Sequence, residues 1–466
     1  MISARRRGAA RLAAAVLASG TASAGALATA GPAAAHEVTP NPGGASATLN
    51  GLTVSDLAVV RDNGTPQQIS AGLFQMTVDN GGTLHTYCID VHTPTLAQAR
   101  YQERPWNATS LHANEDAGKI RWILQNSYPQ VNDLTELAAQ AGSGPLTQET
   151  AAAGTQVAIW RFSDDADVEA VDPAAEKLAD YLEREAEDRK EPRASLALDR
   201  PAISGRSGER LGPITVRTDA GGVTVTASGD SATSGVRVVD GRGEEVTSAT
   251  DGTQLYVDVP AGTPDGAASL TAQAVTKVPV GRAFTSDTTS QTQILAGSSD
   301  STVSATATAV WAERGPVPAL TAQENCAEGG VDVTATNKGD APFTFELAGA
   351  RHTVGAGESK TITVPVKEDQ PYKLTITGPD GFEETFTGAL DCETARGAQR
   401  GEGLTTQLTP ASYGGTIGGG SAGGGGLAAT GGGDTTPVLT GMAVVLIAVG
   451  GGAILTVRRR RTAGAG

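Results

Sequence analysis

Apolar and polar residues alternate along two short runs near the start of the chain, Phe74–Val78 and Leu84–Cys88, with Asp79-Asn80-Gly81-Gly82 between them. Successive side chains of a strand point to opposite faces, so each run predicts a strand with one buried face. An Asn-Gly pair between two such runs is typical of a tight hairpin turn. The pattern therefore predicts a β-hairpin that carries Cys88 near the end of its second strand.

After this hairpin the spacing of apolar residues changes to that of helices. Three segments show it, Ala117–Leu124, Leu134–Ala141 and Gln148–Phe162, and each predicts a helix with a buried face. Asp172-Pro173 is a typical helix start and predicts a fourth, charged helix that runs to about residue 190. Residues 44–192 are therefore predicted to form an α+β domain, a β-sheet with a bundle of helices.

Beyond residue 195 the chain becomes rich in Thr, Val and Gly, and its apolar runs become short. Two of them, Ile214–Thr218 and Val223–Thr226, flank a turn at residues 219–222. Many short strands separated by turn residues indicate β-sandwiches. We therefore predict two all-β, immunoglobulin-like sandwiches, at residues 195–315 and 317–393, that serve as stalk modules.

Residues 394–426 end in a glycine-rich run and contain too little apolar surface to form a core. This composition predicts a disordered linker. It would act as a flexible spacer behind the folded modules.

Both ends of the chain carry the signals of export. Residues 1–35 combine four arginines, a small and apolar stretch and Ala33-Ala34-Ala35, which predicts a cleaved signal peptide. Residues 437–457 are uncharged, mostly apolar and long enough to cross a bilayer, and the arginine-rich segment 458–466 would stay in the cytoplasm. The intervening chain is therefore expected outside the cell.

Shortly before the predicted span lies Leu427-Ala428-Ala429-Thr430-Gly431. A short motif, a span and a basic tail in this order resemble the LAxTG sorting signal of Gram-positive surface proteins. The resemblance implies that a sortase cleaves after Thr430 and joins it to peptidoglycan, so that the membrane is contacted only before sorting. The alternative is a single-pass protein that retains its span.

The net charge is −16, and removal of the two ends, both net positive, would leave the mature chain still more acidic. An acidic surface does not suit nucleic acid or anionic lipid as a partner. Charge and end signals together predict a secreted protein of the cell wall.

Three cysteines occur in the sequence, and two of them, Cys326 and Cys392, lie at the ends of the last predicted sandwich. In an oxidising compartment this placement predicts a disulfide bond. Cys88 is then left over. Such a cysteine is buried and inert, paired with another molecule, or chemically reactive.

A second unusual residue lies in the third predicted helix. Gln156 shares a stripe with Ala152, Ala153, Ile159 and Trp160, which places its carboxamide on the face predicted to be buried. A buried carboxamide is costly without hydrogen bonds. Taken alone, Gln156 fits a polar side chain bonded to a neighbouring strand.

Tyr87-Cys88-Ile89-Asp90 and Thr155-Gln156-Val157-Ala158-Ile159-Trp160 together resemble the two motifs of the thioester domain, or TQXA domain, of Gram-positive surface adhesins. The resemblance covers about residues 44–190. It implies an internal thioester between Cys88 and Gln156, which are the expected reactive residues. It also implies supporting roles for their motif neighbours Tyr87, Asp90, Thr155, Ala158 and Trp160, and His85 is a further candidate near the cysteine.

The predicted function is that of a wall-anchored adhesin whose thioester reacts once with an amine on a partner protein or other surface target. It requires no cofactor and no metal, and it is not an enzyme, because the thioester is consumed. One alternative is a structural or non-covalently binding wall protein with a buried, free Cys88. Another is a cysteine hydrolase or transpeptidase that uses Cys88 with a histidine.

Overall fold

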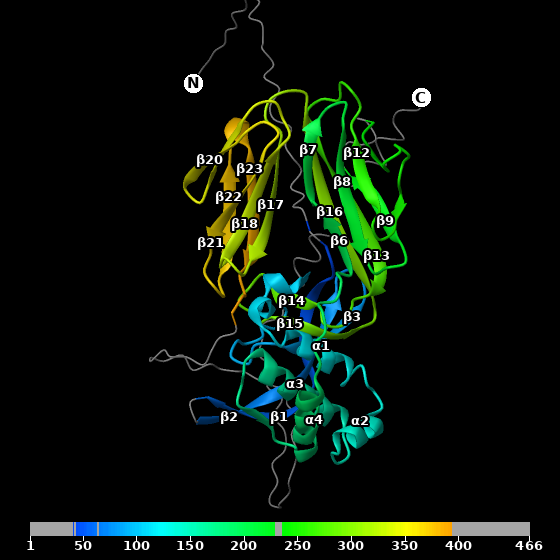
Figure 1. The fold of residues 1–466 in the computed structure, drawn as a ribbon, viewed down its shortest axis with the longest axis vertical. Helices are drawn as coiled ribbons and strands as arrows, with labels where there is room; N and C mark the ends of the chain where they lie inside the picture. The colour runs from blue at the N-terminus through cyan, green and yellow to red at the C-terminus, as the bar shows by residue number, and fades with distance from the viewer. Residues whose placement is uncertain (1–40, 42, 63–64, 229–234, 394–466) are drawn as a thin grey trace, which may run out of the picture. The chain divides into compact units, whose positions relative to one another are not determined.

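The computed structural model describes residues 41, 43–62, 65–228 and 235–393 (Figure 1). The predicted signal peptide, glycine-rich linker, sortase motif, membrane span and cytoplasmic tail lie outside these residues. Within the described part of the chain, no helix has both the length and the apolar character needed to cross a membrane. The described residues are mostly β-structure with a small group of helices.

The α-helices of the described residues lie where the sequence predicts them, and the short 3-10 helices were not predicted. Four are α-helices, and they are α1 Ala117–Gln125, α2 Leu134–Ala141, α3 Gln148–Ser163 and α4 Pro173–Glu185. Three are short 3-10 helices, η1 Trp106–Ala108, η2 Ser110–Ala113 and η3 Pro379–Gly381. Asp133, Thr147 and Asp172 cap the amino ends of α2, α3 and α4 with their side chains. The fourth helix ends at Glu185, earlier than the predicted limit near residue 190.

The first sheet of the described residues has the strand order β2-β3-β15-β14-β4-β1-β5. Its members are β1 Ser46–Asp62, β2 Thr65–Val78, β3 Thr83–Cys88, β4 Arg100–Arg104, β5 Val168–Ala170, β14 Ala283–Ser286 and β15 Gln293–Ser298. Because β1 pairs with both β2 and β4, six of these strands close into a ring.

The predicted hairpin is formed by β2 and β3, which pair with Phe74 opposite Thr86. Its turn closes through hydrogen bonds between Val78 and Gly82 and between Gly81 and Val78. Asn80 has a φ of 65°, a left-handed conformation that asparagine tolerates better than most residues. The turn chemistry read from the sequence therefore sets the register that places Cys88 at the end of β3.

The predicted domain boundary between residues 192 and 195 is wrong for this sheet, because the sheet contains strands from both sides of it. Strands β14 and β15 belong by sequence to the segment 195–315 that we predicted as a separate sandwich. They pair instead with β4 and β3. The first domain is thus discontinuous in sequence, and the pattern of short strands gave no indication of which sheet each strand would join.

The remaining strands of the segment 195–315 form two facing sheets, of four and five strands. They are β6 Leu196–Asp199, β7 Ala202–Arg206, β8 Arg210–Thr218, β9 Val223–Ser228, β10 Arg237–Val239, β11 Ser248–Ala249, β12 Gln254–Asp258, β13 Gly266–Lys277 and β16 Asp300–Ala312. This is the first of the predicted sandwiches.

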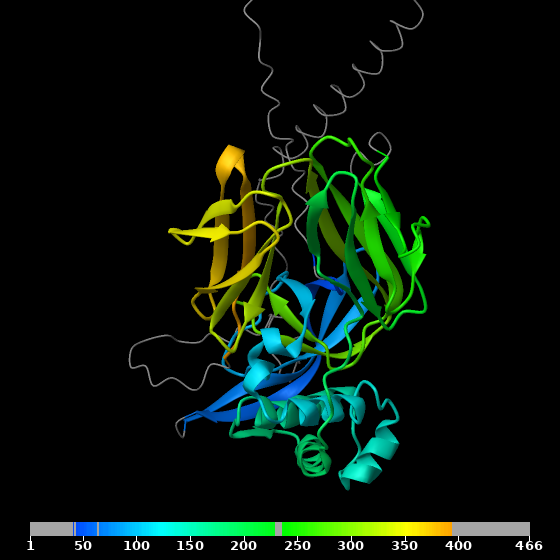
Figure 2. The same ribbon diagram turned by 45° about the horizontal axis from the view of Figure 1, so that its top comes forward.

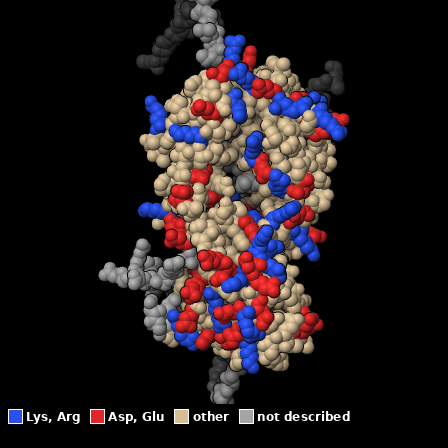
Figure 3. All heavy atoms as spheres, in the orientation of Figure 1, with Lys and Arg blue, Asp and Glu red and all other residues tan. Residues whose placement is uncertain are grey.

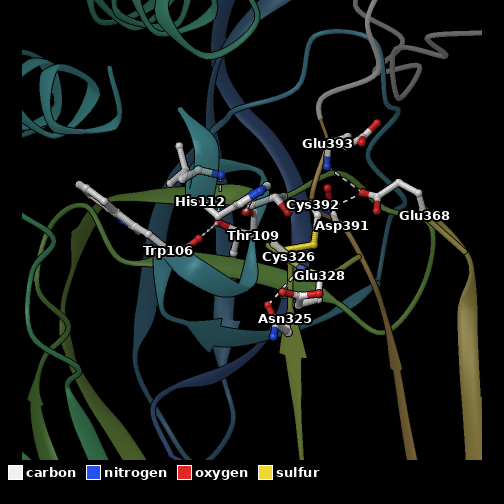
Figure 4. The surroundings of a disulfide bond; sticks show 12 residues. Trp106, Thr109, His112, Asn325, Cys326, Glu328, Glu368, Asp391, Cys392 and Glu393 are labelled. Carbon is white, nitrogen blue, oxygen red and sulfur yellow. Dashed lines mark hydrogen bonds between the residues drawn. A yellow bond between two sulfur atoms is a disulfide. The ribbon is translucent and has the colours of Figure 1, made fainter. Parts of the chain in front are cut away.

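The last sandwich has a three-stranded and a four-stranded sheet. Its strands are β17 Pro318–Asn325, β18 Gly330–Asn337, β19 Phe343–Leu347, β20 Ala350–Val354, β21 Ser359–Pro365, β22 Pro371–Thr377 and β23 Glu383–Ala389. Cys326 and Cys392 form the predicted disulfide, which joins the residue after β17 to a residue just after β23 (Figure 4).

Two apolar cores meet at the first sheet, one on each of its faces. Alternate residues of β15 show this, because Ile294 belongs to the core under the helices and Leu295 to the core shared with the first sandwich. Figure 2 shows the helices gathered along one face of the sheet. The sheet is therefore enclosed by helices on one face and by sandwich strands on the other, which is why the predicted boundary does not hold.

Candidate functional site

Cys88 and Gln156 meet between the sheet and the helices. The Cys88 amide donates to Oε1 of Gln156 at 3.0 Å, and Nε2 of Gln156 donates to the Cys88 carbonyl at 2.9 Å. Cys88 is 2% exposed and Gln156 is fully buried. The two motifs, 68 residues apart in sequence, are therefore joined in the fold.

Helix α3 carries Gln156 into this contact because the helix is enclosed on nearly all sides. We expected one buried stripe, whereas residues 150–160 are all buried. Gly154 allows the close approach of α4, since a Cβ at this position would lie 2.5 Å from the Ala175 carbonyl oxygen. The small residues around Gln156 thus permit tight packing rather than mark an amphipathic surface.

A third polar side chain, that of Gln293, contacts Cys88 and was not predicted from the sequence. Gln293 of β15 donates through Nε2 to Sγ of Cys88 at 3.1 Å, and its Oε1 accepts from the Thr86 hydroxyl at 2.9 Å. Gln293 is fully buried. The sequence does show a glutamine directly before the apolar run Ile294–Ala296, which is unusual for a buried strand. The run was, however, assigned to the predicted sandwich at residues 195–315.

The predicted supporting residues contribute in different ways. The Tyr87 hydroxyl donates to the Tyr128 carbonyl at 2.8 Å, and the Thr155 hydroxyl donates to the Ala151 carbonyl at 2.7 Å. Asp90 accepts from the amides of His92 and Thr93 and so shapes the turn after Cys88. These contacts hold the backbone around the pair rather than touch the sulfur.

The other two supporting residues lie on α3, and the candidate histidine lies on β3. Ala158 is fully buried, and Trp160 is 4% exposed on the same helix as Gln156. His85 lies three residues before Cys88, and burial lowers its pKa. Within the described residues, no hydrogen bond joins His85 to Cys88.

The electrostatics of the site disfavour a thiolate in the unbonded state. Burial raises the pKa of Cys88 well above its usual range, and the nearby charges of Asp90 and Asp164 raise it further, while the hydrogen bond from Gln293 acts in the opposite direction. Asp164, which follows the last residue of α3, also has a strongly raised pKa, because it is buried and lies near Asp90. Burial therefore disfavours the charged form of both the sulfur and this carboxyl.

Among the described residues, one group of acidic side chains could hold a metal ion. It consists of Glu368, Asp369 and Asp391, whose carboxylate oxygens lie within 4.8 Å of one another. Glu368 accepts from the backbone amides of Cys392 and Glu393 beside the disulfide (Figure 4). This group lies in the last sandwich and does not include Cys88 or Gln156.

A buried cysteine and glutamine held together between a sheet and a helix define the class of site. Residues 85–188 match the family described as Thioester domain, a range that contains both Cys88 and Gln156. Gln293 lies outside it. Residues 316–389, the last sandwich, match the family described as Bacterial phospholipase C, C-terminal domain. No curated protein matches the chain.

Several solved structures are similar to parts of this chain. The Bacillus anthracis TIE protein is 14% identical, with a TM-score of 0.27, and covers 74% of this chain and 81% of its own. The thioester domain of the Enterococcus faecium TIE86 protein is 16% identical, with a TM-score of 0.26, and covers 58% and 97%. The thioester domain of the Staphylococcus aureus TIE protein is 13% identical, with a TM-score of 0.20, and covers 57% and 98%.

Proposed function

We propose that this protein is a cell-wall-anchored surface adhesin that attaches covalently to a partner through a thioester between Cys88 and Gln156. The observation that carries the proposal is the paired contact of the Gln156 carboxamide with Cys88 in a buried site, inside the region that matches the thioester family. The sequence signals for export and sorting supply the location.

The bond follows from the groups that meet here. The sulfur of Cys88 bonds to Cδ of Gln156, the bond from Cδ to Nε2 breaks, and the thiol proton leaves with the nitrogen as ammonia. Holding the two groups together supplies much of the reduction in the barrier. The burial of both residues keeps water from the product.

The stored thioester then reacts with a primary amine of a protein or other surface target. The amine nitrogen bonds to Cδ, the bond to sulfur breaks, and Cys88 regains a thiol. The amide that results is a covalent attachment and is not subject to the limit of non-covalent affinity. Each molecule reacts once, so the protein binds its target without turnover.

The mass of the mature protein tests this proposal. Residues 36–430 should be lighter by one ammonia, beyond the two hydrogens lost in the disulfide. Cys88→Ala should restore that ammonia, and methylamine should add once, at Gln156. A wild-type protein of full mass would contradict the proposal.

A second candidate is a structural or non-covalently binding wall protein with a free Cys88. It is favoured by the fact that both polar atoms of the Gln156 carboxamide already have hydrogen-bond partners without any bond to sulfur. This candidate predicts full mass and a Cys88 thiol that an alkylating reagent reaches only after unfolding.

A further inference from the structure

The backbone of Cys88 is bonded to the side chain of Gln156 through both of its polar groups. The Cys88 N–H donates to Oε1 at 3.0 Å, and the Cys88 carbonyl accepts from Nε2 at 2.9 Å. Both residues are buried, so these contacts take the place of water for the two backbone groups. The reactive atom Cδ carries both Oε1 and Nε2 and therefore lies between the two contacts.

The fold explains why these backbone groups are free to bind a side chain. The next amide, that of Ile89, donates to the Thr292 carbonyl just before β15. Successive amides of an extended chain point to opposite sides, so the Cys88 amide points away from β15. On that side β2 pairs with β3 only as far as Thr86. The carboxamide of Gln156 therefore takes the place that a longer pairing of β2 would fill.

The sulfur of Cys88 has a partner on the neighbouring strand. Gln293 lies opposite Cys88 in the pairing of β3 with β15, and its Nε2 donates to Sγ at 3.1 Å. The oxygen, nitrogen and sulfur that bond to Cδ during the reaction thus each lie against a buried group of the protein. Two of these groups belong to the Cys88 backbone.

We propose that the backbone of Cys88 selects primary over secondary amines as partners of the thioester. Its N–H holds the thioester oxygen, and its carbonyl accepts one N–H of the attacking nitrogen. This inference rests on the proposed function. Ammonia leaves from the position of Nε2 when the thioester forms, and attack by an amine is the reverse of that step with a different nitrogen. The attacking nitrogen therefore enters against the Cys88 carbonyl.

The hydrogens of a primary amine match these contacts. The nitrogen of the neutral amine bonds to Cδ, and an electron pair of the C=O bond moves to the oxygen, where the Cys88 N–H stabilises the negative charge. The C=O bond then forms again, the bond from Cδ to Sγ breaks, and one proton of the nitrogen passes to the sulfur. The second hydrogen of the nitrogen stays bonded to the Cys88 carbonyl.

A secondary amine brings only one hydrogen. That hydrogen must pass to the sulfur, so the Cys88 carbonyl is left without a donor in a buried site. Leaving a buried acceptor unpaired is costly, and the cost corresponds to about a tenfold or greater loss of rate. The number of hydrogens on the nitrogen, rather than the size of the amine, should therefore decide how fast it reacts.

Ethylamine and dimethylamine test this selection, because they are isomers of similar basicity that differ in the number of hydrogens on nitrogen. Their rates of addition to the wild-type protein, followed by mass, are compared with their rates on S-methyl thiobutanoate in solution. The ratio of ethylamine to dimethylamine should be about tenfold or more higher for the protein. Cys88→Ala should add neither amine. Equal ratios for the protein and the small thioester would overturn the selection while leaving the thioester intact.

An infrared spectrum measures the contact with the oxygen separately. The thioester carbonyl band, identified by its loss when methylamine is added, should lie at lower frequency than that of S-methyl thiobutanoate in cyclohexane. The reason is that a hydrogen bond from the Cys88 N–H weakens the C=O bond. A band at the cyclohexane frequency contradicts the role of that N–H. If the wild-type protein has full mass, the proposed function itself fails and this inference fails with it.

Discussion

Gln293 forms hydrogen bonds to two buried groups of this site, Cys88 and Thr86. Its amide nitrogen donates to the Cys88 sulfur and its amide oxygen accepts from Thr86, so one side chain satisfies two buried groups. A hydrogen bond to sulfur favours the thiolate, and here it partly offsets the effect of burial on the pKa of Cys88. The reactivity of the cysteine therefore depends on a residue far from it in sequence.

Replacement of Gln293 by Met should slow thioester formation and destabilise the protein. Met has a similar shape without the polar atoms, so the pKa of Cys88 should rise further and the buried Thr86 hydroxyl should lose its partner. Leaving that group unpaired costs about 1–3 kcal/mol in the free energy of unfolding. The loss of ammonia, followed by mass after refolding, measures the rate. Gln67→Met, at an exposed position of β2, is the control, and equal rates in the two variants contradict the expectation.

Asp391 should make stability depend on pH. Burial raises its pKa to about 7, neighbouring carboxylates raise it as well, and its hydrogen bond from Thr292 opposes them. The folded state then holds a proton that the unfolded state releases at lower pH, so stability should fall as pH rises from about 4 to about 7. Burial likewise raises the pKa of Asp369, to about 6, so that it contributes with the same sign.

Urea unfolding across this range of pH measures the effect. Asp391→Asn should reduce the fall in the free energy of unfolding with pH, whereas Asp380→Asn, at an exposed position, should not. A variant and a wild type with the same pH profile would show that Asp391 is not the group responsible.

At the scale of elements, the hairpin of β14 and β15 is the piece that joins the parts of the chain. Arg282, directly before β14, forms ion pairs with Glu103 at 2.8 Å and with Glu191 at 2.6 Å. Glu103 also accepts from the Ser195 amide. A buried charge cluster thus fastens the hairpin to the segment that links α4 to the first sandwich.

Arg282→Met should destabilise the protein by about 3–5 kcal/mol, because it leaves the carboxylate of Glu103 buried without its partner. Arg217→Met removes an ion pair to Asp199 that is half exposed on both sides, and it should cost less than about 1 kcal/mol. Chemical denaturation of the two variants gives the comparison. A cost for Arg282→Met as small as that of the control contradicts the role assigned to the cluster.

At the scale of the whole molecule, the first sheet binds helices and sandwich into one folding unit. Its two faces belong to two cores, and strands from residues 283–298 lie between β3 and β4. Figure 3 shows acidic and basic side chains interspersed on one face of the molecule, most densely over the helices. The two apolar cores, rather than the distribution of surface charges, determine which segments of the chain fold together.

A chain of residues 36–192 should therefore not fold, whereas residues 36–315 should. The shorter chain lacks two strands of the ring and exposes the apolar face that the sandwich covers. Thermal unfolding followed by circular dichroism should be cooperative only for the longer chain. A cooperative transition in the shorter one would mean that the hairpin is dispensable.

The disulfide should also set how the last sandwich responds to tension. A pull between residues 36 and 430 enters at β17, an extended strand, reaches Cys326 and crosses directly to Cys392. The segment between the cysteines, which are 66 positions apart in sequence, lies outside this path and should not lengthen.

Force spectroscopy of the oxidised protein should show no step from this segment. Cys326→Ser combined with Cys392→Ser should add a step of about 220 Å, from the extended length of a residue. A step of that size in the oxidised wild type would contradict the assigned path.

The sequence by itself determined the local elements and singled out Cys88 and Gln156. The Asn-Gly turn, the helix caps and the period of apolar residues act between neighbours in the chain, so the β2–β3 hairpin and the starts of α2, α3 and α4 followed from it. The motifs at Cys88 and Gln156 could also be recognised, because Tyr87-Cys88-Ile89-Asp90 and Thr155-Gln156-Val157-Ala158 resemble the two motifs of a known family. The predicted sorting motif and span remain predictions.

Only the tertiary structure decided which strands share a sheet. Backbone hydrogen bonds of a strand are the same whichever partner it finds, and an apolar face fits any apolar surface of suitable shape. The assignment of β15 to the first sheet, and with it the contact between Gln293 and Cys88, therefore depended on packing across two cores. The same packing left Trp160 and Asp164 with unpaired polar atoms, which no local pattern in the sequence could reveal.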